Sequence, residues 1–533
     1  MPPPSLSGTQ RLCLNAVLAA FVVRMLHLSD LSLWLDEGAT WWNATRESWT
    51  ATALAEHNHP PVWWLVTRLS LSIFSPDESG LRMPSVIAGV LAVILSGLLA
   101  RRLVDPARVP SRGRFVGLDR RATVWVVLLS SIGAFWIAMS QEARMYSGLL
   151  AESIGLSLLY LRWLDKNRRS ALVAYGLLAS FSLYTHYFAV LPILAHALHA
   201  LLVSRRTRGD AIPVRFLPFF ATVAVAGISF IPWFVYFLKE PPGVSTTIVP
   251  PYGRLLHALW RMAVGPAFVP LDRVRADEGV QSVLRDQPVA ITISALFWLV
   301  PLVYGVKALG RDRGLRSFLA CGILVPSVAI LAIGVKYPLV EEKYLVFLAP
   351  LLLLTAVLGA LAAPRWKRPV LLAALVGVHA AGFVAYHLHD VPAVVDVLGG
   401  GHEYGKEQWG QVARAVEKAT HKGDVVLLHA PYLYLVWDFY AKGVGKERVL
   451  LPAPDRPCDA EMSVAELRQA VPALADAKYV VLVLSHECAR DRDTYRRLVR
   501  ETLNGQSGAV WDEHPITNYP LQWGIRVATF ERR

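Results

Sequence analysis

Long apolar stretches alternate with short arginine-rich loops along the first 390 residues of the chain. Several of these stretches reach the roughly 20 residues that a helix needs to cross the hydrocarbon core of a bilayer. The alternation therefore predicts a polytopic bundle of membrane-spanning helices. After about residue 400 the pattern changes, because short β-branched runs such as 425–429 and 479–484 alternate with amphipathic helical patterns. That second pattern indicates a small α/β domain.

The change of pattern divides the chain into a predicted transmembrane domain, 1–390, and a predicted soluble α/β domain, 391–533. The two runs named above are expected to be strands of the second domain. Helical spacing of apolar residues predicts helices between and around them, at 407–420, 431–440, 464–474 and 490–503.

Positive charge sets the predicted orientation of the spans. Lys and Arg concentrate in five short loops, which the positive-inside rule places in the cytoplasm together with Arg11: 101–121, 162–169, 205–215, 307–316 and 365–368. Because cytoplasmic loops are separated by an even number of crossings, about 11 spans are expected: 12–29, 82–103, two in 122–161, two in 171–203, 216–238, 289–306, 317–335, 344–363 and 369–387. The runs 62–75 and 254–269 are left over and are expected to be interfacial helices on the outer surface.

Composition agrees with this topology. Hydrophobic residues make up 54% of the 533 residues and charged residues only 18%, whereas about 25% is usual for soluble domains. The net charge of +13 lies mostly in the loops, so it reflects orientation and does not indicate nucleic-acid binding. The expected location is the cytoplasmic (inner) membrane, with the N-terminus cytoplasmic and the C-terminal domain extracytoplasmic. Cys458 and Cys488 fall in that domain, and whether they form a disulfide stays open.

The orientation places the unusual polar groups on one face of the membrane. They are Asp36-Glu37, His57-Asn58-His59, Glu142 with Arg144 and Tyr146, His186-Tyr187, and Lys343-Tyr344. Ionisable groups at span ends are costly unless they pair or serve a site. Each also has a plain interpretation: solvated loop acids for Asp36 and Glu37, a helix start for His59, and span-end anchors for Lys343 and Tyr344.

Taken together, these groups suit one kind of chemistry. Carboxylates act as general bases and as cation ligands. Arg, Lys, Tyr and His donate hydrogen bonds to phosphate, and an apolar groove between span ends suits a lipid tail. The combination predicts a site for a lipid-linked sugar phosphate and an acceptor hydroxyl. No glycine-rich phosphate loop is present in the sequence, so a nucleotide donor is not supported.

Five motifs in this order resemble the GT-C superfamily of membrane glycosyltransferases: Trp34-Leu35-Asp36-Glu37, His59-Pro60-Pro61, Leu81-Arg82-Met83-Pro84-Ser85, Gln141-Glu142-Ala143-Arg144-Met145-Tyr146 and Thr185-His186-Tyr187-Phe188. The resemblance covers roughly residues 10–390. The most similar branch comprises bacterial relatives of protein O-mannosyltransferases and of the lipid A aminoarabinose transferase.

The resemblance implies an enzyme that moves a hexosyl or pentosyl group, with inversion, from a polyprenyl-phosphate donor to an extracytoplasmic acceptor hydroxyl. The acceptor would be a glycan, lipid or protein at the membrane lipid surface. Asp36 would be the general base and Glu37 its partner. The remaining roles would be donor-phosphate binding by His59, Arg144, Tyr146, Lys343 and Tyr344, and binding of a divalent metal ion by His186 and Glu37.

One position departs from the family pattern. Relatives often have an acidic residue just before the paired prolines, where this chain has Asn58-His59. That departure leaves metal dependence open.

Two other classes of protein remain as alternatives. A transporter or flippase of lipid-linked sugars would place its charges at the bilayer midplane and show internal repeats, and neither is evident in this sequence. A non-enzymatic envelope assembly protein would use the external α/β domain to bind glycan, and Asp36 would then be dispensable.

Overall fold

The computed structural model describes residues 7–104, 119–207, 216–239, 251–266, 288–310, 313–337, 339–388, 408–420, 424–441, 448–453, 456, 460–485, 493–505, 510–514, 517–519 and 525–533. The chain divides into two compact units. Unit 1 comprises residues 1–28 and 46–404, and unit 2 comprises residues 29–45 and 405–533. The predicted boundary at 390/391 lies outside the described residues. The short segment 29–45, which carries Asp36 and Glu37, belongs to unit 2, which the sequence did not indicate.

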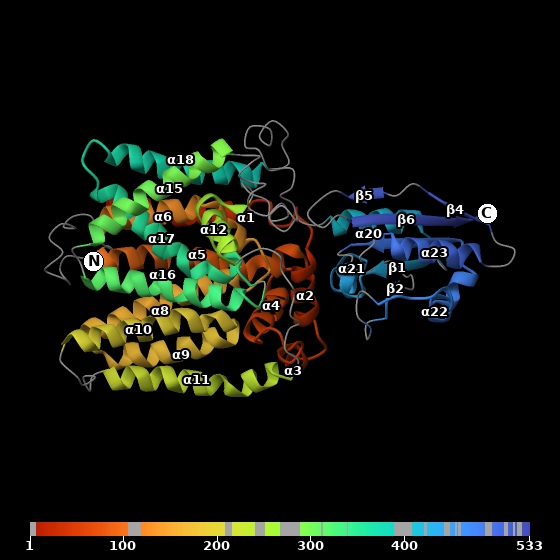
Figure 1. Cartoon of the computed structure of the whole chain (residues 1–533), viewed down its shortest axis with the longest axis horizontal. Coiled ribbons are helices and arrows are strands. Elements are labelled where there is room, and N and C mark those ends of the chain that lie inside the picture. The colour runs from red at the N-terminus through yellow and green to blue at the C-terminus, as the bar shows by residue number, and fades with distance from the viewer. Residues whose placement is uncertain are drawn as a thin grey trace, which may run out of the picture. The chain divides into compact units, whose positions relative to one another are not determined.

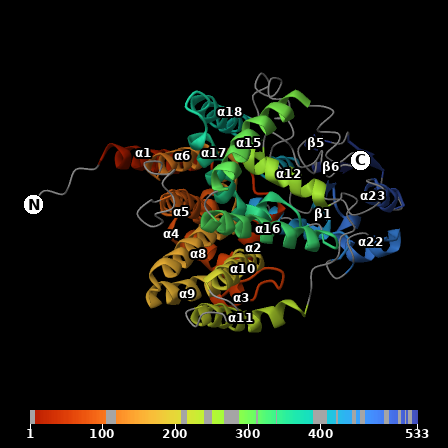
Figure 2. The same cartoon turned by 60° about the vertical axis from the view of Figure 1, so that its left-hand side comes forward.

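Unit 1 is a bundle of long helices that lie side by side (Figure 1). A helix occupies each predicted span: α1 (Gly8–Met25), α5 (Glu78–Val104), α6 (Asp119–Ile132) with α7 (Ala134–Ser140), α8 (Tyr146–Lys166), α9 (Arg169–Thr185), α10 (Val190–Thr207), α11 (Leu217–Phe237), α15 (Pro288–Leu309), α16 (Arg313–Gly334), η5 (Glu342–Leu348) with α17 (Ala349–Ala362), and α18 (Arg368–His387). Helices α9, α10 and α11 form one side of the bundle, and α15, α17 and α18 form another (Figure 2).

Within the described residues, seven helices are long and apolar enough to cross a membrane, or eight if the bent pair α6 and α7 is one span. The protein is therefore an integral membrane protein with several spans. Helices α1, α8 and α9 lie at predicted spans but fall outside this group. Helix α8 falls outside because it contains the charged residues Glu152, Arg162 and Asp165. Helix α9 falls outside because it has only 17 residues. The number of 11 crossings stays a prediction.

The break between α6 and α7 is stabilised by a buried arginine. The two helices meet at an angle of 59°, and the break leaves the carbonyls of Ser130 and Ser131 without the helical N–H groups that would follow. Arg24 of α1, fully buried, donates to both carbonyls at 3.2 Å and to Ser140 Oγ at 3.0 Å. Backbone groups at membrane depth need such partners because lipid offers none.

Two shorter helices occupy the runs that were expected to lie at the membrane surface. They are α4 (Val62–Ile73) and α12 (Pro251–Val264). A short helix, α3 (Trp49–Ala53), precedes α4, and a single 3₁₀ turn, η2 (Tyr187–Ala189), connects α9 to α10. The helical state of both runs is confirmed, whereas their position on the outer surface stays a prediction.

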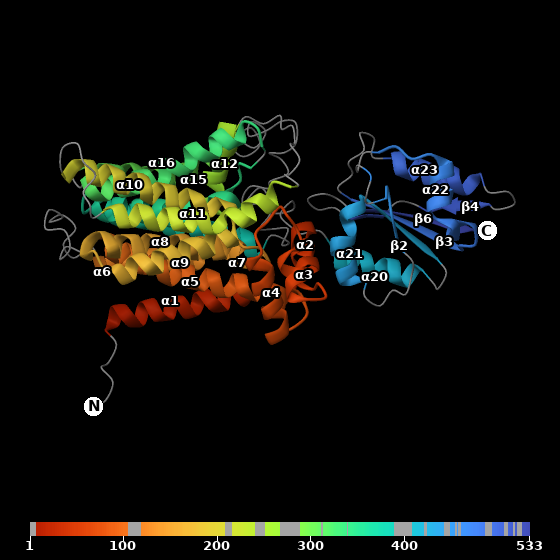
Figure 3. The same ribbon diagram turned by 90° about the horizontal axis from the view of Figure 1, so that it is seen from below.

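Unit 2 is an α/β domain built on a six-stranded mixed sheet of order β2-β1-β3-β6-β4, with β5 also paired to β6. The strands are β1 (Val425–His429), β2 (Arg448–Leu450), β3 (Tyr479–Leu484), β4 (Trp511–Glu513), β5 (Thr517–Tyr519) and β6 (Ile525–Arg532). Strand β1 runs parallel to β2 and β3, and β6 is antiparallel to β3. Helices α22 (Val464–Ala470) and α23 (Thr494–Asn504) cover one face, and α20 (Trp409–Ala419) and α21 (Tyr434–Tyr440) lie on the other (Figure 3).

The predicted strands at 425–429 and 479–484 match β1 and β3 at both ends. The four predicted helices correspond to α20, to η7 (Pro431–Leu433) with α21, to α22 with η8 (Pro472–Ala475), and to α23. Strands β2, β4, β5 and β6 were not predicted. Cys458 and Cys488 lie outside the described residues.

Candidate functional site

Six predicted site residues from four separate stretches meet inside unit 1 and form what we call the cationic-aromatic cluster. Its members are His59, Arg144, Tyr146, His186, Lys343 and Tyr344. The sequence placed them on one face of the membrane without showing that they touch. Their roles stay proposals, but the structure brings all six together.

Every member of the cluster lies at or near a helix end, where the backbone departs from helical geometry. His59 stands before the paired prolines that precede α4, and Arg144 is two residues before α8. His186 ends α9 in an extended conformation, and its Nδ1 accepts a hydrogen bond from the Phe188 N–H at 3.1 Å. Lys343 follows the first residue of η5, which begins after the extended residue Glu341. The cluster is thus assembled from connections between helices.

Aromatic rings hold the cationic groups in place. The ring centroids of Tyr146, His186 and Tyr344 lie 6.0–6.2 Å from one another. The Lys343 Nζ lies 6.0 Å from the Tyr146 ring centroid and 5.3 Å from that of Tyr344. The Arg144 guanidinium lies 5.5 Å from the Trp64 ring centroid. Contacts of this kind favour cations, since the faces of aromatic rings carry negative potential.

Hydrogen bonds fix the tautomer of His59. The Arg144 Nη2 lies 3.0 Å from His59 Nε2. Because a guanidinium can only donate, Nε2 accepts, and Nδ1 carries the proton that it shares with the Glu56 carboxylate. Glu56 thereby supplies an acid next to the paired prolines. The pattern of the relatives has its acid directly before the prolines, so the sequence analysis did not single out Glu56. The spacing of three residues between Glu56 and His59 was a usable signal.

Positive charge surrounds His186. This side chain is buried in the turn between α9 and η2. Burial lowers the pKa of His186 well below its usual range, and its neighbours His59, Arg144 and Lys343 lower it further. His186 is therefore neutral at physiological pH and acts as a hydrogen-bonding group.

The depressed pKa of His186 predicts a loss of stability in acid. The unfolded chain binds a proton near the ordinary pKa of roughly 6.5, whereas the folded chain does so only at lower pH. Stability is then fully present above about pH 6.5 and falls as the pH drops below it. We expect the thermal midpoint of His186→Phe to fall less between pH 7.5 and pH 5 than that of the wild type. An equal fall in both proteins would contradict this.

A buried ion pair supports the stretch that carries Lys343 and Tyr344. Arg261 of α12 contacts Glu342 of η5 at 3.2 Å, and both side chains are more than nine-tenths buried. Lys343 itself pairs with Glu341 at 3.1 Å. On the other side of the cluster, Ser85 Oγ donates to the Arg144 carbonyl at 3.0 Å. Sequence reasoning missed Arg261, because nothing in the linear pattern links α12 to η5.

Asp36 and Glu37 lie in the first turn of α2 (Leu35–Ala44), which belongs to unit 2. Carboxylates are favoured there by the partial positive charge of a helix N-terminus. Glu37 is fully buried and Asp36 is partly exposed. Of the two, Asp36 is the carboxylate that is accessible from outside the protein.

The residues that flank segment 29–45 on both sides are held by hydrogen bonds within unit 1. Before it, Gln141 Nε2 donates to the Leu26 carbonyl at 2.7 Å, and Arg82 Nη1 donates to the Leu28 carbonyl at 2.6 Å. After it, Arg68 Nη1 donates to the Arg46 carbonyl at 2.5 Å. Buried side chains thus fix the points at which the segment leaves and re-enters the bundle.

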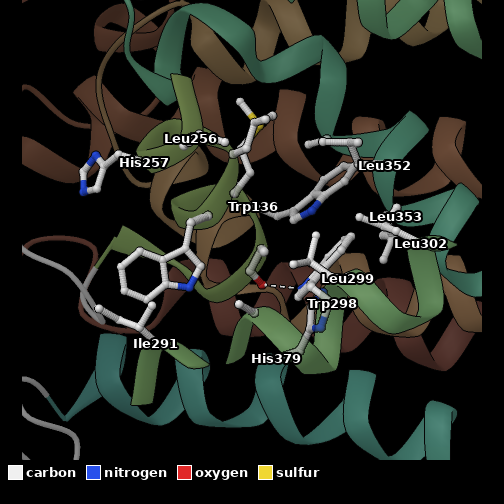
Figure 4. A pocket seen from close by; sticks show the side chains of 16 residues that line it. Trp136, Leu256, His257, Ile291, Trp298, Leu299, Leu302, Leu352, Leu353 and His379 are labelled. Carbon is white, nitrogen blue, oxygen red and sulfur yellow. Dashed lines mark hydrogen bonds between the residues drawn. The ribbon is translucent and has the colours of Figure 1, made fainter. Parts of the chain in front are cut away.

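Two apolar hollows lie in unit 1. One, of about 590 Å³, lies between α4, α5, α8 and α9, and Trp63, Gly148 and Phe181 help to line it. The other, of about 360 Å³, lies between α7, α12, α15, α17 and α18. Figure 4 shows Trp136, Trp298 and His379 around the second hollow, with the Trp298 indole donating to the Ala263 carbonyl at 3.1 Å. Both linings are almost entirely hydrophobic and suit hydrocarbon.

The surroundings of His186 do not fit a metal ion. In the part of the chain that the structure describes, no group of three His, Cys, Asp or Glu side chains is placed to hold one. The charged groups nearest His186 are cationic and would repel a divalent ion. They suit an anion such as phosphate instead.

No family model matches the sequence, and no curated protein sequence does so either. Solved structures match, and the chain is structurally similar to GT-C glycosyltransferases. ArnT from Cupriavidus metallidurans bound to undecaprenyl phosphate matches over 97% of this chain and 97% of its own, with a TM-score of 0.54 and 15% identity. The oligosaccharyltransferase AglB from Archaeoglobus fulgidus, in complex with an inhibitory peptide and a dolichol-phosphate, matches over 89% of this chain and 69% of its own, with a TM-score of 0.52 and 13% identity. A complex of the A. fulgidus oligosaccharyltransferase with Zn and sulfate matches over 88% of this chain and 67% of its own, with a TM-score of 0.51 and 13% identity. At these identities the likeness shows the fold alone, so the predicted resemblance to GT-C glycosyltransferases is confirmed as a resemblance in fold.

Proposed function

We propose that the protein is an inverting glycosyltransferase that moves a sugar from a polyprenyl-phosphate donor to an acceptor hydroxyl at the outer surface of the cytoplasmic membrane. The observation that carries this proposal is the cationic-aromatic cluster. The buried Arg144, the partly buried Lys343, two tyrosines and two histidines from four separate stretches converge there. Such a set of donors suits a phosphate held in a water-poor site.

In the proposed reaction, Asp36 takes the proton of the acceptor hydroxyl. The oxygen attacks C1 of the sugar while the bond from C1 to the phosphate oxygen breaks. The electron pair of that bond leaves with the phosphate, and Arg144 and Lys343 stabilise the charge that develops on it. A single displacement of this kind inverts the anomeric centre.

The hollow of about 590 Å³ is the proposed place for the polyprenyl chain. Its lining includes Trp63, next to the Trp64 that contacts Arg144, and Gly148, two residues beyond Tyr146. The chain would therefore lie along the same helices, α4 and α8, whose starts carry the cluster. ArnT and AglB, which share the fold, have been solved with undecaprenyl phosphate and with a dolichol-phosphate, respectively.

The proposal can be tested with the full-length protein in lipid nanodiscs. A panel of undecaprenyl-phosphate sugars is supplied together with a bacterial envelope extract, and release of undecaprenyl phosphate is measured. We expect release with at least one donor, and only when the extract is present. A protein that moves labelled donor lipid between the leaflets of sealed vesicles without releasing undecaprenyl phosphate would instead be a flippase.

A further inference from the structure

The helix that carries Asp36 is held by the C-terminal domain through aromatic contacts. The Trp41 ring packs edge-on against Phe439 of α21, with centroids 5.4 Å apart, and Trp42 packs in the same way against Tyr434 at 4.9 Å. Trp41 and Trp42 stand in the last turn of α2, close to the two carboxylates in its first turn. Large rings in such geometry contribute both buried area and orientation.

A hydrogen bond holds the start of the same segment. The Leu33 N–H donates to the Tyr440 hydroxyl at 2.6 Å, just before α2 begins. Nearby, the Gly410 N–H of α20 donates to Ser32 Oγ at 3.1 Å. The start of the segment is therefore tied to α20 and α21, and the last turn of α2 is tied to α21.

Gly38 shows how closely the two helices approach. A Cβ at this position would lie 2.7 Å from the Leu435 carbonyl oxygen and 2.9 Å from the Val436 Cα. These are backbone atoms of α21, so they cannot rotate away as a side chain would. The residue directly after the Asp36-Glu37 pair thus fits α21 only because it has no side chain.

We propose that α21 is a positioning element of the transferase, with Tyr440 as its principal positioning residue. In holding α2, it sets the orientation of Asp36. The C-terminal domain then serves the reaction by fixing the general base, without having to contact the sugar donor. This inference rests on the proposed function, because it assigns a role to the base of that reaction.

Two variants with matched controls test the inference in the full-length protein. Tyr440→Phe removes only the hydroxyl that accepts from Leu33, and Tyr479→Phe removes an equally short hydrogen bond, to Glu531, elsewhere in unit 2. Gly38→Ala places a methyl group against α21, and Gly227→Ala adds one where nothing lies within 4 Å. The readouts are hydrogen exchange of a peptide containing α2, and kcat and KM for the donor that proves active in the nanodisc assay.

We expect Tyr440→Phe to speed exchange in α2 and to lower kcat by about fivefold, the effect of one hydrogen bond. Gly38→Ala is expected to lower kcat more, by about tenfold, with the KM for the donor unchanged in both variants. The controls should match the wild type. Wild-type exchange in both variants would overturn the inference, and so would faster exchange with unchanged kcat. If the wild type releases no undecaprenyl phosphate with any donor, the proposed function fails, while exchange still decides whether α21 holds α2.

Discussion

Replacing Asp36 by asparagine is expected to lower the rate of sugar transfer by about 10²–10⁴-fold, the range that a positioned general base contributes. The amide keeps the size and much of the hydrogen-bonding capacity of the carboxylate but cannot accept the acceptor's proton. Binding of undecaprenyl phosphate, which depends on the cationic-aromatic cluster, should be unchanged. The rate of sugar transfer is measured by the release of undecaprenyl phosphate in nanodiscs, and the binding of undecaprenyl phosphate by native mass spectrometry.

Asp30→Asn is the matched control, since Asp30 lies on the same segment outside α2. We expect it to retain nearly full activity. Wild-type turnover by Asp36→Asn would remove the general base from the proposed mechanism and would favour a glycan-binding assembly protein. Loss of lipid binding together with loss of turnover would instead indicate that the substitution disturbs the fold.

The second large effect is expected when the cluster loses a cation. Arg144→Gln or Lys343→Gln should weaken the binding of undecaprenyl phosphate by about 10–100-fold, because hydrogen bonds to charged groups contribute roughly 1.5–3 kcal/mol each. Arg144→Lys should recover only part of the loss, since it keeps the charge but not the planar fork that contacts His59. The dissociation constant can be measured in nanodiscs with undecaprenyl phosphate alone.

Lys336→Gln provides the control for the loss of charge. Lys336 lies over the Tyr337 ring, at 5.6 Å from its centroid, on the connection that leads to Lys343. Its replacement should leave the dissociation constant unchanged. An equal loss in Lys336→Gln and Lys343→Gln would show that binding depends on net charge at the surface and not on the cluster.

The sequence predicted most helices and the central parallel strands because each depends on a local pattern. Apolar length and loop charge located the spans, and short runs rich in Val and Leu located β1 and β3, which are buried on both faces. Strand β6 was missed. It carries charged residues such as Arg526 and Glu531, and it is an inner strand because it pairs with β3 on one side and with β4 and β5 on the other. Pairing between distant segments leaves no periodic signal in either one.

In the candidate site, too, features that depend on local pattern were predictable and contacts between distant segments were not. The types of residue in the cluster were predictable as donors that suit a phosphate, and loop charge placed them on one face of the membrane without showing that they touch. The supports were not predictable: the Arg261–Glu342 ion pair and the attachment of α2 to α21 join elements far apart in the chain. Such contacts depend on the shapes of two packed surfaces, which composition and spacing do not encode. The surroundings of His186, whose metal ligation stays a prediction, were not predictable for a related reason, since Arg144 and Lys343 come from other stretches of the chain.

The attachment of α2 to α21 also imposes an order on biosynthesis. Tyr440 lies 407 residues after Leu33, so at roughly 5–20 residues per second the ribosome needs about 20–80 s to produce the partner of a helix that has already emerged. During that interval Trp41 and Trp42 lack their aromatic partners, while the bundle that anchors their segment is being inserted. Unit 2 thus combines segment 29–45, which is made among the first residues, with the last part of the chain to be made. A chain that stops before residue 434 would leave this helix uncovered and give cellular quality control a means to recognise it.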